Sequence, residues 1–514
     1  MRAATLLAIC MSTATVTTNA PVTRGDSLAT GVMFMLALNV VQRAVGFVRG
    51  LLFCRFLSDA ALGQFSLAYS FLMLAAPLVV LGLPGSLGRY VEFYRQRGQL
   101  AVYLRKMTIA TLLLTGIGTL VMTCFARPLA YLVFDDAGQT RLMGYALATL
   151  CLVAIFNYLN ELLTSLRQVR AVSCMQFVNS LTFTIVGVGL VFVWESSAEA
   201  IVVAYAISCV AAIVAVLPWL SQLKAEFAHD TQPLRGTDAW SKLLPFAMWV
   251  WLTNLVANLA DFVDRFMILH VSGLDTHAGQ ALVGQYHSSR VVPLLFATLA
   301  ATLAAIVLPH WSHAWETGLK AKVSAQVNLA VKLLAMLFTT GSLLVLWCAP
   351  LLFGVVLGGK YDDGLAALPW ALVGCVWFSL LLVAQNYLLC AEKARLVMVA
   401  CLLGLILNVG FNLVALPWGL AAILAARAWA SLAAAIVVLL CSARLGLHCS
   451  RGLMIALALP LIILAGPIFG PLFVVAIVVG DWRLRWLFDE DEERQLKALA
   501  TRLATQVKDK LLPA

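Results

Sequence analysis

Apolar runs recur along almost the whole chain, each near the roughly 20 residues that a helix needs to cross a bilayer, and short polar loops separate them. Of the 514 residues, 62% are hydrophobic and only 12% are charged, and the mean hydropathy is +0.93. A soluble domain does not have this composition. Because backbone polar groups inside a membrane have to be satisfied within the chain, the runs predict an all-α polytopic membrane protein.

We expect twelve membrane spans from these runs. They are Leu28–Leu57, Phe65–Leu87, Met107–Phe125, Leu142–Leu163, Val172–Trp194, Ile201–Leu220, Leu243–His270, Val283–Leu308, Leu329–Leu357, Ala366–Cys390, Leu396–Leu416 and Leu420–Cys441. A further stretch, Leu453–Gly480, is long enough for one tilted span or, broken at its Gly-Pro pairs, for two short ones.

Basic residues in the loops predict the orientation, because short cytoplasmic loops carry the excess of Lys and Arg. With the amino terminus inside, the inner loops carry Arg89, Arg95, Arg97, Arg105, Lys106, Arg167, Arg170, Lys224, Arg235, Lys242, Lys320, Lys322, Lys393, Arg395, Arg444 and Arg451, and the outer loops carry only Arg55, Arg127, Arg141 and Lys360. The basic tail, residues 481–514, also belongs inside. Both termini are therefore expected to be cytoplasmic, which favours two short spans at 452–480, a hairpin, and about 14 spans in all.

The net charge of +10 is explained by this topology and by contact with anionic membrane lipids, and it does not indicate nucleic acid binding. The 12 cysteines are scattered through apolar runs without the spacing of metal ligands, so we expect no metal site. Residues 1–27 contain a short apolar core, Ala3–Cys10, with little charge before it. We interpret them as a cytoplasmic tail and not as a secretion signal.

The seventh span repeats the first. Asn39, Gly46-Phe47-Val48 and Arg49 correspond to Asn254, Asp261-Phe262-Val263 and Asp264 at an offset of 215 residues, and Leu62-Gly63-Gln64-Phe65 corresponds to Val283-Gly284-Gln285-Tyr286 at an offset of 221. Six spans separate the copies, so the repeats are parallel and the cargo path is expected between them. The predicted units are an N-lobe (28–220), a cytoplasmic linker (221–242), a C-lobe (243–442), a C-terminal membrane hairpin (452–480) and a cytoplasmic tail (481–514).

Two arginines, Arg43 and Arg49, lie inside the first apolar run. A charged side chain at membrane depth costs about 2.5 to 3.5 kcal/mol even on the lenient insertion scale, so it indicates a substrate or ion path. Two cations in one helix indicate an anionic cargo, and Gln42 and Asn39 extend the same polar flank. The alternatives are that Arg49 reaches outward to lipid headgroups and that Arg43 pairs with a buried acid such as Glu161.

The seventh span carries a polar stripe of Asn254, Asn258, Asp261 and Arg265 at helical spacing. Arg265 is a further candidate for binding the cargo. Asp261 and Arg265 also have the acid-before-base spacing of a structural ion pair, which is the alternative interpretation.

Asp264 has no partner on its own helix. Together with Asp261 and the amides of Asn408 and Asn412 from a later span, it is a candidate for coupling transport to H⁺ or Na⁺. Arg290, in the eighth span, adds another cation to the C-lobe and to the expected cargo site.

The segments Arg43-Ala44-Val45-Gly46-Phe47-Val48-Arg49, Leu62-Gly63-Gln64-Phe65-Ser66-Leu67, Leu81-Gly82-Leu83-Pro84, Arg89-Tyr90 and Phe262-Val263-Asp264-Arg265 resemble the oligosaccharide flippases of the multidrug/oligosaccharidyl-lipid/polysaccharide exporter superfamily. The resemblance implies a V-shaped transporter of two six-helix lobes with a cationic lumen. It implies movement of undecaprenyl-pyrophosphate-linked oligosaccharide across the bacterial cytoplasmic (inner) membrane, with no cofactor. Partners would be membrane lipids and the polysaccharide polymerase or chain-length machinery.

The lipid II branch of these flippases has an acidic residue after the first outer loop, where this chain has Gly63-Gln64-Phe65, so polysaccharide or O-antigen units are the expected cargo. A multidrug exporter of the same superfamily is the nearest alternative, but its usually cationic cargo would be repelled by the arginines. A membrane enzyme acting on lipid-linked sugar would need a larger outer loop than this chain has, so the protein is expected not to be an enzyme. A non-transporting scaffold that recruits partners through its tail is the last alternative.

Overall fold

The structure is a computed structural model that describes residues 28–95, 97–194, 196–226, 236–484, 486–489, 492 and 494. The predicted amino-terminal tail (1–27), part of the linker and most of the carboxyl-terminal tail lie outside these residues. The described residues form helices and connecting loops without a strand, and eleven of the helical segments are long and apolar enough to cross a membrane. The prediction of an all-α multi-pass membrane protein is therefore confirmed.

The first half of the chain forms a run of long helices with short turns between them. They are α2 (Leu28–Phe56), α3 (Asp59–Val79), η1 (Leu83–Ser86), α4 (Leu87–Arg95), α5 (Leu100–Cys124), α6 (Ala126–Phe134), η2 (Ala137–Gln139), α7 (Thr140–Ser165), α8 (Val169–Val193) and α9 (Ala198–Glu226).

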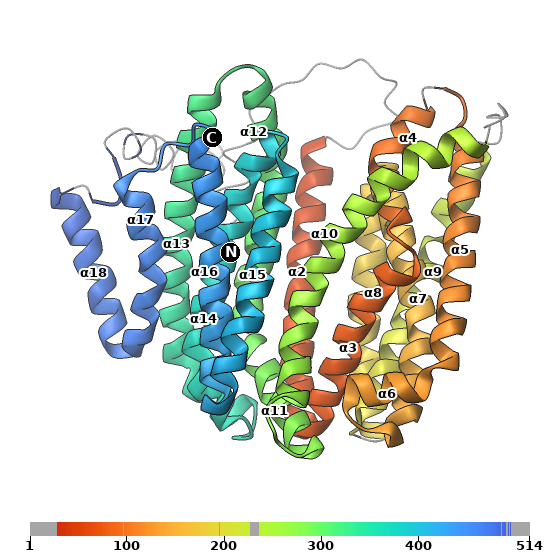
Figure 1. Ribbon diagram of the computed structural model, residues 1–514, viewed down its shortest axis with the longest axis horizontal. Helices are drawn as coiled ribbons and strands as arrows, with labels where there is room; N and C mark the ends of the chain where they lie inside the picture. Colours follow the sequence, from red (N-terminus) through yellow and green to blue (C-terminus); the bar gives the residue numbers. More distant parts are fainter. Residues whose placement is uncertain are drawn as a thin grey trace, which may run out of the picture.

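The second half follows the same plan. Its helices are α10 (Gly236–His270), α11 (Thr276–Arg290), α12 (Pro293–Glu316), α13 (Lys320–Leu351), the short π-helical turn η4 (Leu352–Val356), α14 (Asp362–Cys390), α15 (Ala394–Ala415), η5 (Leu416–Trp418) and α16 (Leu420–Arg444). In Figure 1, α3 to α9 stand on one side and α12 to α16 on the other, with α2 and α10 between them. The exact lobe boundaries stay a prediction.

Several of the expected spans differ from the helices that form, and for two of them the local sequence gives the reason. The span Phe65–Leu87 begins earlier, because Ser58 caps α3 by accepting a hydrogen bond from the backbone N–H of Ala61. It also ends earlier, at Val79, because Gly82 adopts a left-handed backbone with φ of +67° and Pro84 follows. The span Val283–Leu308 is divided between α11 and α12, and Pro293 is the first residue of α12, where its missing N–H is tolerated.

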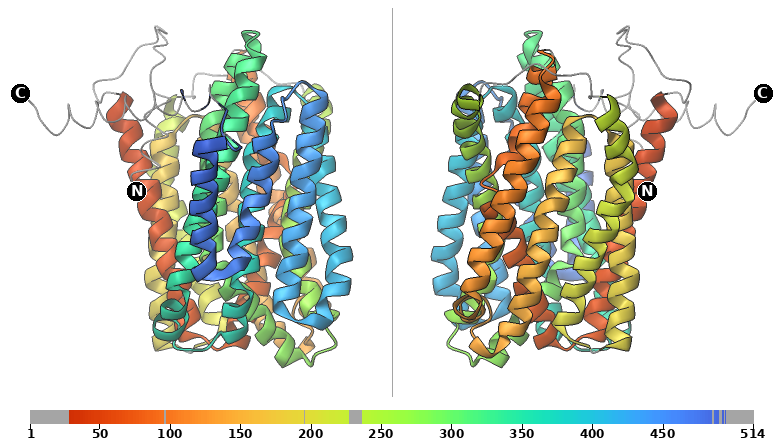
Figure 2. Two further views of the ribbon diagram at one scale, coloured as in Figure 1. Left: turned by 90° about the vertical axis from the view of Figure 1, so that its left-hand side faces the viewer. Right: turned by 90° about the vertical axis from the view of Figure 1, so that its right-hand side faces the viewer.

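The last apolar stretch is broken where the Gly-Pro pairs predict a break. It forms α17 (Arg451–Ala458), the 3₁₀ segment η6 (Leu459–Ala465) and α18 (Gly466–Leu484), and Gly466 turns the chain with φ of +82°. The resulting hairpin lies beside α13 on the outside of the bundle (Figure 1 and Figure 2). The total of about 14 spans stays a prediction.

The repeated segments Leu62-Gly63-Gln64-Phe65 and Val283-Gly284-Gln285-Tyr286 meet where α3 crosses α11. A Cβ atom on Gly63 would lie 1.8 Å from the carbonyl oxygen of Gln280, and one on Gly284 would lie 2.0 Å from that of Asp59. Only glycine permits such a close approach of two helices. The two halves of the chain are thus in backbone contact at this crossing, at the lower end of the bundle in Figure 1.

The crossing is also symmetric in its polar contacts. The Nε2 of Gln64 donates to Oε1 of Gln280 at 2.8 Å, and the Nε2 of Gln285 donates to Oδ2 of Asp59 at 3.3 Å. Gln64 and Gln285 are equivalent at the offset of 221, and so are Asp59 and Gln280. Each of these two contacts is therefore the equivalent of the other in the repeat. A two-fold axis running between α3 and α11 requires this arrangement.

Candidate substrate and ion-coupling site

Arg43 connects the two halves of the molecule. Its Nη2 donates a hydrogen bond to Oγ1 of Thr302 on α12 at 2.6 Å, although 259 residues separate them in the chain. The predicted alternative, an ion pair with Glu161, does not form. Arg43 therefore presents its charge between α2 and α12, toward the second half and not toward the lipid.

Arg49, six residues further along α2, points into the first half. Its guanidinium carbon lies 4.3 Å from the centre of the Phe183 ring, and its Nη1 donates to the backbone carbonyl of Ser180 at 3.4 Å. The Phe183 ring packs against Tyr205, which packs against Tyr69. These contacts direct the guanidinium toward α8 and not outward to headgroups, and an aromatic face stabilises a cation without neutralising it.

In the described part of the chain, no carboxylate forms an ion pair with Arg43 or Arg49. Asn39 and Gln42 lie on the same helix within one turn of Arg43, and both are partly exposed. The amino-terminal half thus holds two guanidinium groups whose charges are not compensated. Such groups are expensive to keep in a membrane and can bind an anion.

Asp264 is completely buried and accepts hydrogen bonds from four side chains. The Nδ2 atoms of Asn408 and Asn412 donate to its Oδ1 at 2.5 and 3.0 Å, and the hydroxyl of Tyr286 donates to its Oδ2 at 2.6 Å. The guanidinium of Arg427, on α16, forms an ion pair with the same Oδ2. The structure therefore brings Asp264, Asn408 and Asn412 together as predicted, but the carboxylate is not free, because Arg427 neutralises it.

Asp261 differs from Asp264 in its exposure, because 51% of its side chain is accessible. Its Oδ1 accepts from Nη2 of Arg290 at 3.2 Å and from Nη2 of Arg427 at 2.5 Å. The alternative interpretation, an ion pair between Asp261 and Arg265, does not form. The Nη1 of Arg265 donates to the backbone carbonyl of Asp261 at 2.5 Å and not to its carboxylate.

Arg265 instead reaches across to the other half. Its Nε donates to Oγ of Ser66 on α3 at 2.8 Å, and its side chain is buried. Because Asp261 lies four residues before Arg265, both side chains leave α10 on the side that faces α3. Asp261 therefore lies on the same side of α10 as Arg265, and Arg290 and Arg427 hold its carboxylate.

The charged side chains thus form two groups, Arg43 and Arg49 on α2 and, in the second half, Asp261, Asp264, Arg265, Arg290 and Arg427. In the part of the chain that the structure describes, the five arginines of these groups, Arg43, Arg49, Arg265, Arg290 and Arg427, form ion pairs with only two carboxylates. The region therefore carries an excess of three positive charges. Such an excess suits an anion and repels a cation.

Arg427 is a candidate site residue that the sequence interpretation missed. It is a lone arginine in the apolar run Leu420–Cys441, and the rule that singled out Arg43 applies to it equally. Lys332 is another such residue in the run Leu329–Leu357. It is completely buried and binds both carboxylate oxygens of Glu492, at 3.0 and 2.8 Å.

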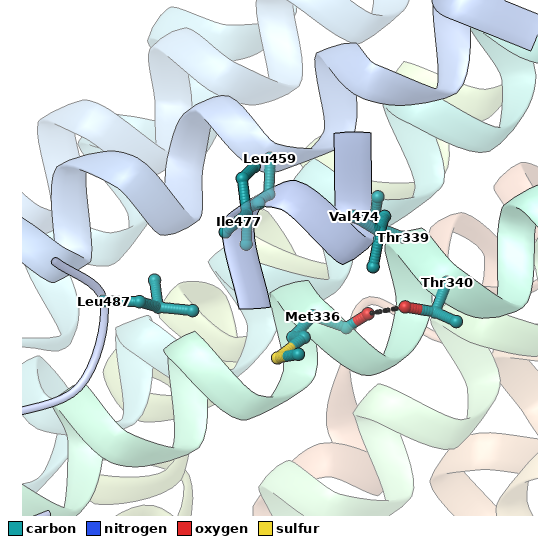
Figure 3. Close-up of a pocket in the computed structure, with 7 residues that line it drawn as sticks. All are labelled: Met336, Thr339, Thr340, Leu459, Val474, Ile477 and Leu487. Atoms are coloured by element: carbon teal, nitrogen blue, oxygen red, sulfur yellow. Dashed lines mark hydrogen bonds between the residues drawn. The ribbon is translucent and has the colours of Figure 1, made fainter. Parts of the chain in front are cut away.

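A small pocket beside the C-terminal hairpin does not have this chemistry. Figure 3 shows it between α13, η6 and α18, and its lining residues are Met336, Thr339, Thr340, Leu459, Val474, Ile477 and Leu487. None of them is charged, and the hydroxyl of Thr340 is bonded to the carbonyl of Met336 at 2.9 Å. An apolar pocket of this kind does not suit a phosphate.

The described helices and the charged side chains between the two halves define a multi-pass membrane protein. The model of the polysaccharide biosynthesis protein family matches residues 28–313, more than half of the chain, and the chain belongs to this family. No curated protein matches the chain.

Solved structures of the MOP superfamily have a similar fold. A MATE-family multidrug resistance transporter in its inward-facing conformation has a TM-score of 0.62 and 15% identity, covering 78% of this chain and 94% of that one. The lipid II flippase MurJ, in an inward closed conformation, has a TM-score of 0.59 and 12% identity, covering 88% and 99%. A MOP-superfamily transporter from Pyrococcus furiosus Vc1 has a TM-score of 0.58 and 16% identity, covering 81% and 94%.

Proposed function

We propose that this protein is a flippase that moves an undecaprenyl-pyrophosphate-linked oligosaccharide across the cytoplasmic membrane for polysaccharide or lipopolysaccharide synthesis. The observation that carries the proposal is the pair Arg43 and Arg49. Both guanidinium groups lie in a membrane helix without a carboxylate partner in the described residues, one against α12 and the other against α8. Family membership and the MurJ-like fold are consistent with this cargo.

The chemistry of the cargo fits these groups. A pyrophosphate that links a lipid to a sugar carries two negative charges, and moving it through hydrocarbon unassisted is prohibitive. Guanidinium groups replace its water with charge-assisted and often bidentate hydrogen bonds. The excess of three positive charges between the halves exceeds the two charges of the cargo, so the site can attract the head group while the polyprenyl tail stays in the lipid.

Alternating access follows from the α3/α11 crossing. In the proposed orientation, with both termini in the bacterial cytoplasm, the crossing lies at the outer face and the basic loops lie at the inner face. The glycine contacts at Gly63 and Gly284 close the outer side. We therefore assign the structure to an inward-facing state, and transport requires that α3 and α11 separate at this crossing while the lobes rock around the charged region.

The coupling ion is the second part of the proposal. Asp264 with Asn408 and Asn412 would hold H⁺ or Na⁺, but the guanidinium of Arg427 already occupies the place of a cation beside that carboxylate. Coupling through Asp264 therefore requires Arg427 to move away during the cycle. The test compares wild type and Asp264→Asn for uptake of lipid-linked sugar by vesicles over a range of pH and sodium concentration, and an unchanged profile removes Asp264 from the coupling site.

A multidrug exporter is the main alternative, because structures with a similar fold include multidrug transporters. The excess positive charge near Arg43 and Arg49 argues against the cationic cargo of such exporters. The scaffold alternative concerns the carboxyl-terminal tail, most of which lies outside the described residues. A polysaccharide polymerase or chain-length regulator remains the expected partner in the membrane.

The decisive experiment removes the charge of Arg43, which no carboxylate in the described residues compensates. In a strain that depends on this protein for surface polysaccharide, Arg43→Ala should abolish the polysaccharide while the protein remains in the membrane in normal amount. The matched control is Arg127→Ala on α6, an exposed arginine, which should export normally. Normal export by Arg43→Ala would refute the proposal.

A further inference from the structure

Two carboxylates one helical turn apart on α10 have opposite environments, although both bind arginine. Asp264 is fully buried and held by Tyr286, Asn408, Asn412 and Arg427. Asp261 is half exposed, and side chains bind only its Oδ1 among the contacts that the structure describes. The carboxylate of Asp264 is therefore fixed in place. The carboxylate of Asp261 can rotate away from the two arginines, because it has no buried set of partners to lose.

The donors that face Asp261 are held in place by other groups. The Nη1 of Arg427 is fixed by Asp264, and the Nη1 of Arg290 donates to the hydroxyl of Tyr286 at 3.0 Å. This leaves the Nη2 of each arginine, and both converge on the single oxygen Oδ1 of Asp261, at 2.5 and 3.2 Å. Two fixed N–H donors aimed at one anionic oxygen are the arrangement that binds a phosphate oxygen.

We propose that Arg290 and Arg427 form a second phosphate subsite, and that Asp261 is the internal counter-ion that the phosphate of the cargo displaces. The carboxylate oxygen of Asp261 stands where a phosphate oxygen binds. This proposal rests on the proposed function, since it assigns the second half of the protein a role in holding the same pyrophosphate that Arg43 and Arg49 attract.

The arrangement has a consequence for turnover. With Asp261 in place, Asp261, Asp264, Arg290 and Arg427 together are neutral, so the subsite is not left as an exposed pair of cations when it is empty. When the cargo leaves, the carboxylate returns to the two arginines and competes with rebinding. Asp261 thus lowers the affinity for the anion and speeds its release, which a transporter needs on the side of delivery.

The test measures binding of farnesyl pyrophosphate, a short lipid pyrophosphate, to the full-length protein in detergent, with inorganic pyrophosphate and farnesol as the two halves of the ligand. Asp261→Asn should bind farnesyl pyrophosphate at least tenfold more tightly than wild type, because the competing charge is gone. Asp261→Glu, which keeps the charge, should bind close to wild type. Transport of lipid-linked sugar by Asp261→Asn should be slower because release is slower.

Two controls make the outcome specific. Asp362→Asn, at the exposed start of α14, removes the same charge elsewhere and should leave binding unchanged. Adding Arg290→Gln to Asp261→Asn should abolish the gain in affinity. An equal gain from Asp362→Asn, or a gain that survives Arg290→Gln, overturns the subsite.

The experiment also separates this proposal from the proposed function. If wild type binds farnesyl pyrophosphate in a manner that depends on Arg43, and Asp261→Asn binds it no more tightly, the displacement of Asp261 is wrong and the flippase assignment stands. If neither protein binds farnesyl pyrophosphate, both are wrong. Should Asp261→Asn fail to fold, Arg290→Gln in the wild-type background gives a second measurement, with an expected tenfold loss of affinity.

Discussion

Ser66 and His287, which hold equivalent positions in the two halves of the chain, lie in contact, with 3.1 Å between Oγ of Ser66 and Nδ1 of His287. Residues that a two-fold axis relates can touch only if they lie next to that axis. The glycines Gly63 and Gly284, three residues earlier in each copy, make the close backbone contacts beside it. The duplication therefore relates residues at the interface between the lobes as well as residues within each lobe.

The glycine crossing leads to the first prediction. Gly63→Val and Gly284→Val should each prevent closure at the α3/α11 crossing, because even a Cβ atom would lie within 2.0 Å of a carbonyl oxygen of the opposite helix. Export should fall by about tenfold or more, equivalent to about 1.4 kcal/mol or more in the free energy of the closed state. Double electron–electron resonance between spin labels at Ser58 and Asp275, in a background without native cysteines, should show a longer distance.

Gly116→Val provides the control for this measurement, because no atom lies within 4 Å of a Cβ at Gly116 on α5. It should keep the wild-type distance and export. An unchanged distance in Gly63→Val would show that the crossing does not depend on the absence of a side chain.

The second prediction concerns the buried pair Asp264 and Arg427. Arg427→Leu should lower the stability by about 3 to 5 kcal/mol, because the carboxylate of Asp264 is left buried without a counter-charge. Combining Arg427→Leu with Asp264→Asn should recover part of the loss, since neither charge remains. Apparent melting temperatures of the purified proteins in detergent measure both effects, and additive losses in the double variant would contradict this account.

The third prediction concerns the C-terminal segment. Glu492→Gln should leave the ammonium group of Lys332 buried and without its counter-ion, so it should destabilise the protein more than the double change Lys332→Met with Glu492→Leu. The contact between α13 and the segment after α18 should loosen in Glu492→Gln. Limited proteolysis measures this as faster cleavage after residue 484, and Lys322→Met, an exposed lysine on α13, should cleave at the wild-type rate.

The fourth prediction distinguishes the charge of Arg49 from its shape. Arg49→Lys keeps the charge but loses the planar group that lies 4.3 Å above the Phe183 ring and the N–H that reaches Ser180. Surface polysaccharide should fall by about five- to tenfold, corresponding to about 1 to 1.4 kcal/mol. Arg127→Lys, at the exposed start of α6, should have little effect. Equal export by Arg49→Lys and wild type would show that charge alone suffices at this position.

Much of the fold was predictable because it depends on local patterns. Apolar runs long enough to cross a membrane have to form helices there, so α7, α8 and α14 to α16 begin and end near the expected residues. The boundaries of α3 and α11 were less predictable. A polar residue at the start of a helix, such as Asp59 or Thr276, is not part of an apolar run, although it belongs to the helix.

The candidate site was predictable in its residue types and not in its pairings. The desolvation cost of a charge in a membrane singles out Arg43 and Asp264 from the sequence, and the same cost should have singled out Arg427. The sequence pairs Asp261 with Arg265, because they are neighbours on one helix. In the structure, Arg290 and Arg427 bind the carboxylate of Asp261 instead.

The sequence by itself determined that the chain spans a membrane many times, that its two halves are copies, and that cations and carboxylates lie at membrane depth. Hydrophobic periodicity and the cost of burying charge act residue by residue, and both can be read from a linear chain. Only the tertiary structure decided which charges are neutralised and which remain available. Asp264 and Arg427 are 163 residues apart, and they meet because α10 and α16 pack into one bundle, whereas no acid reaches Arg43 or Arg49 in the described residues.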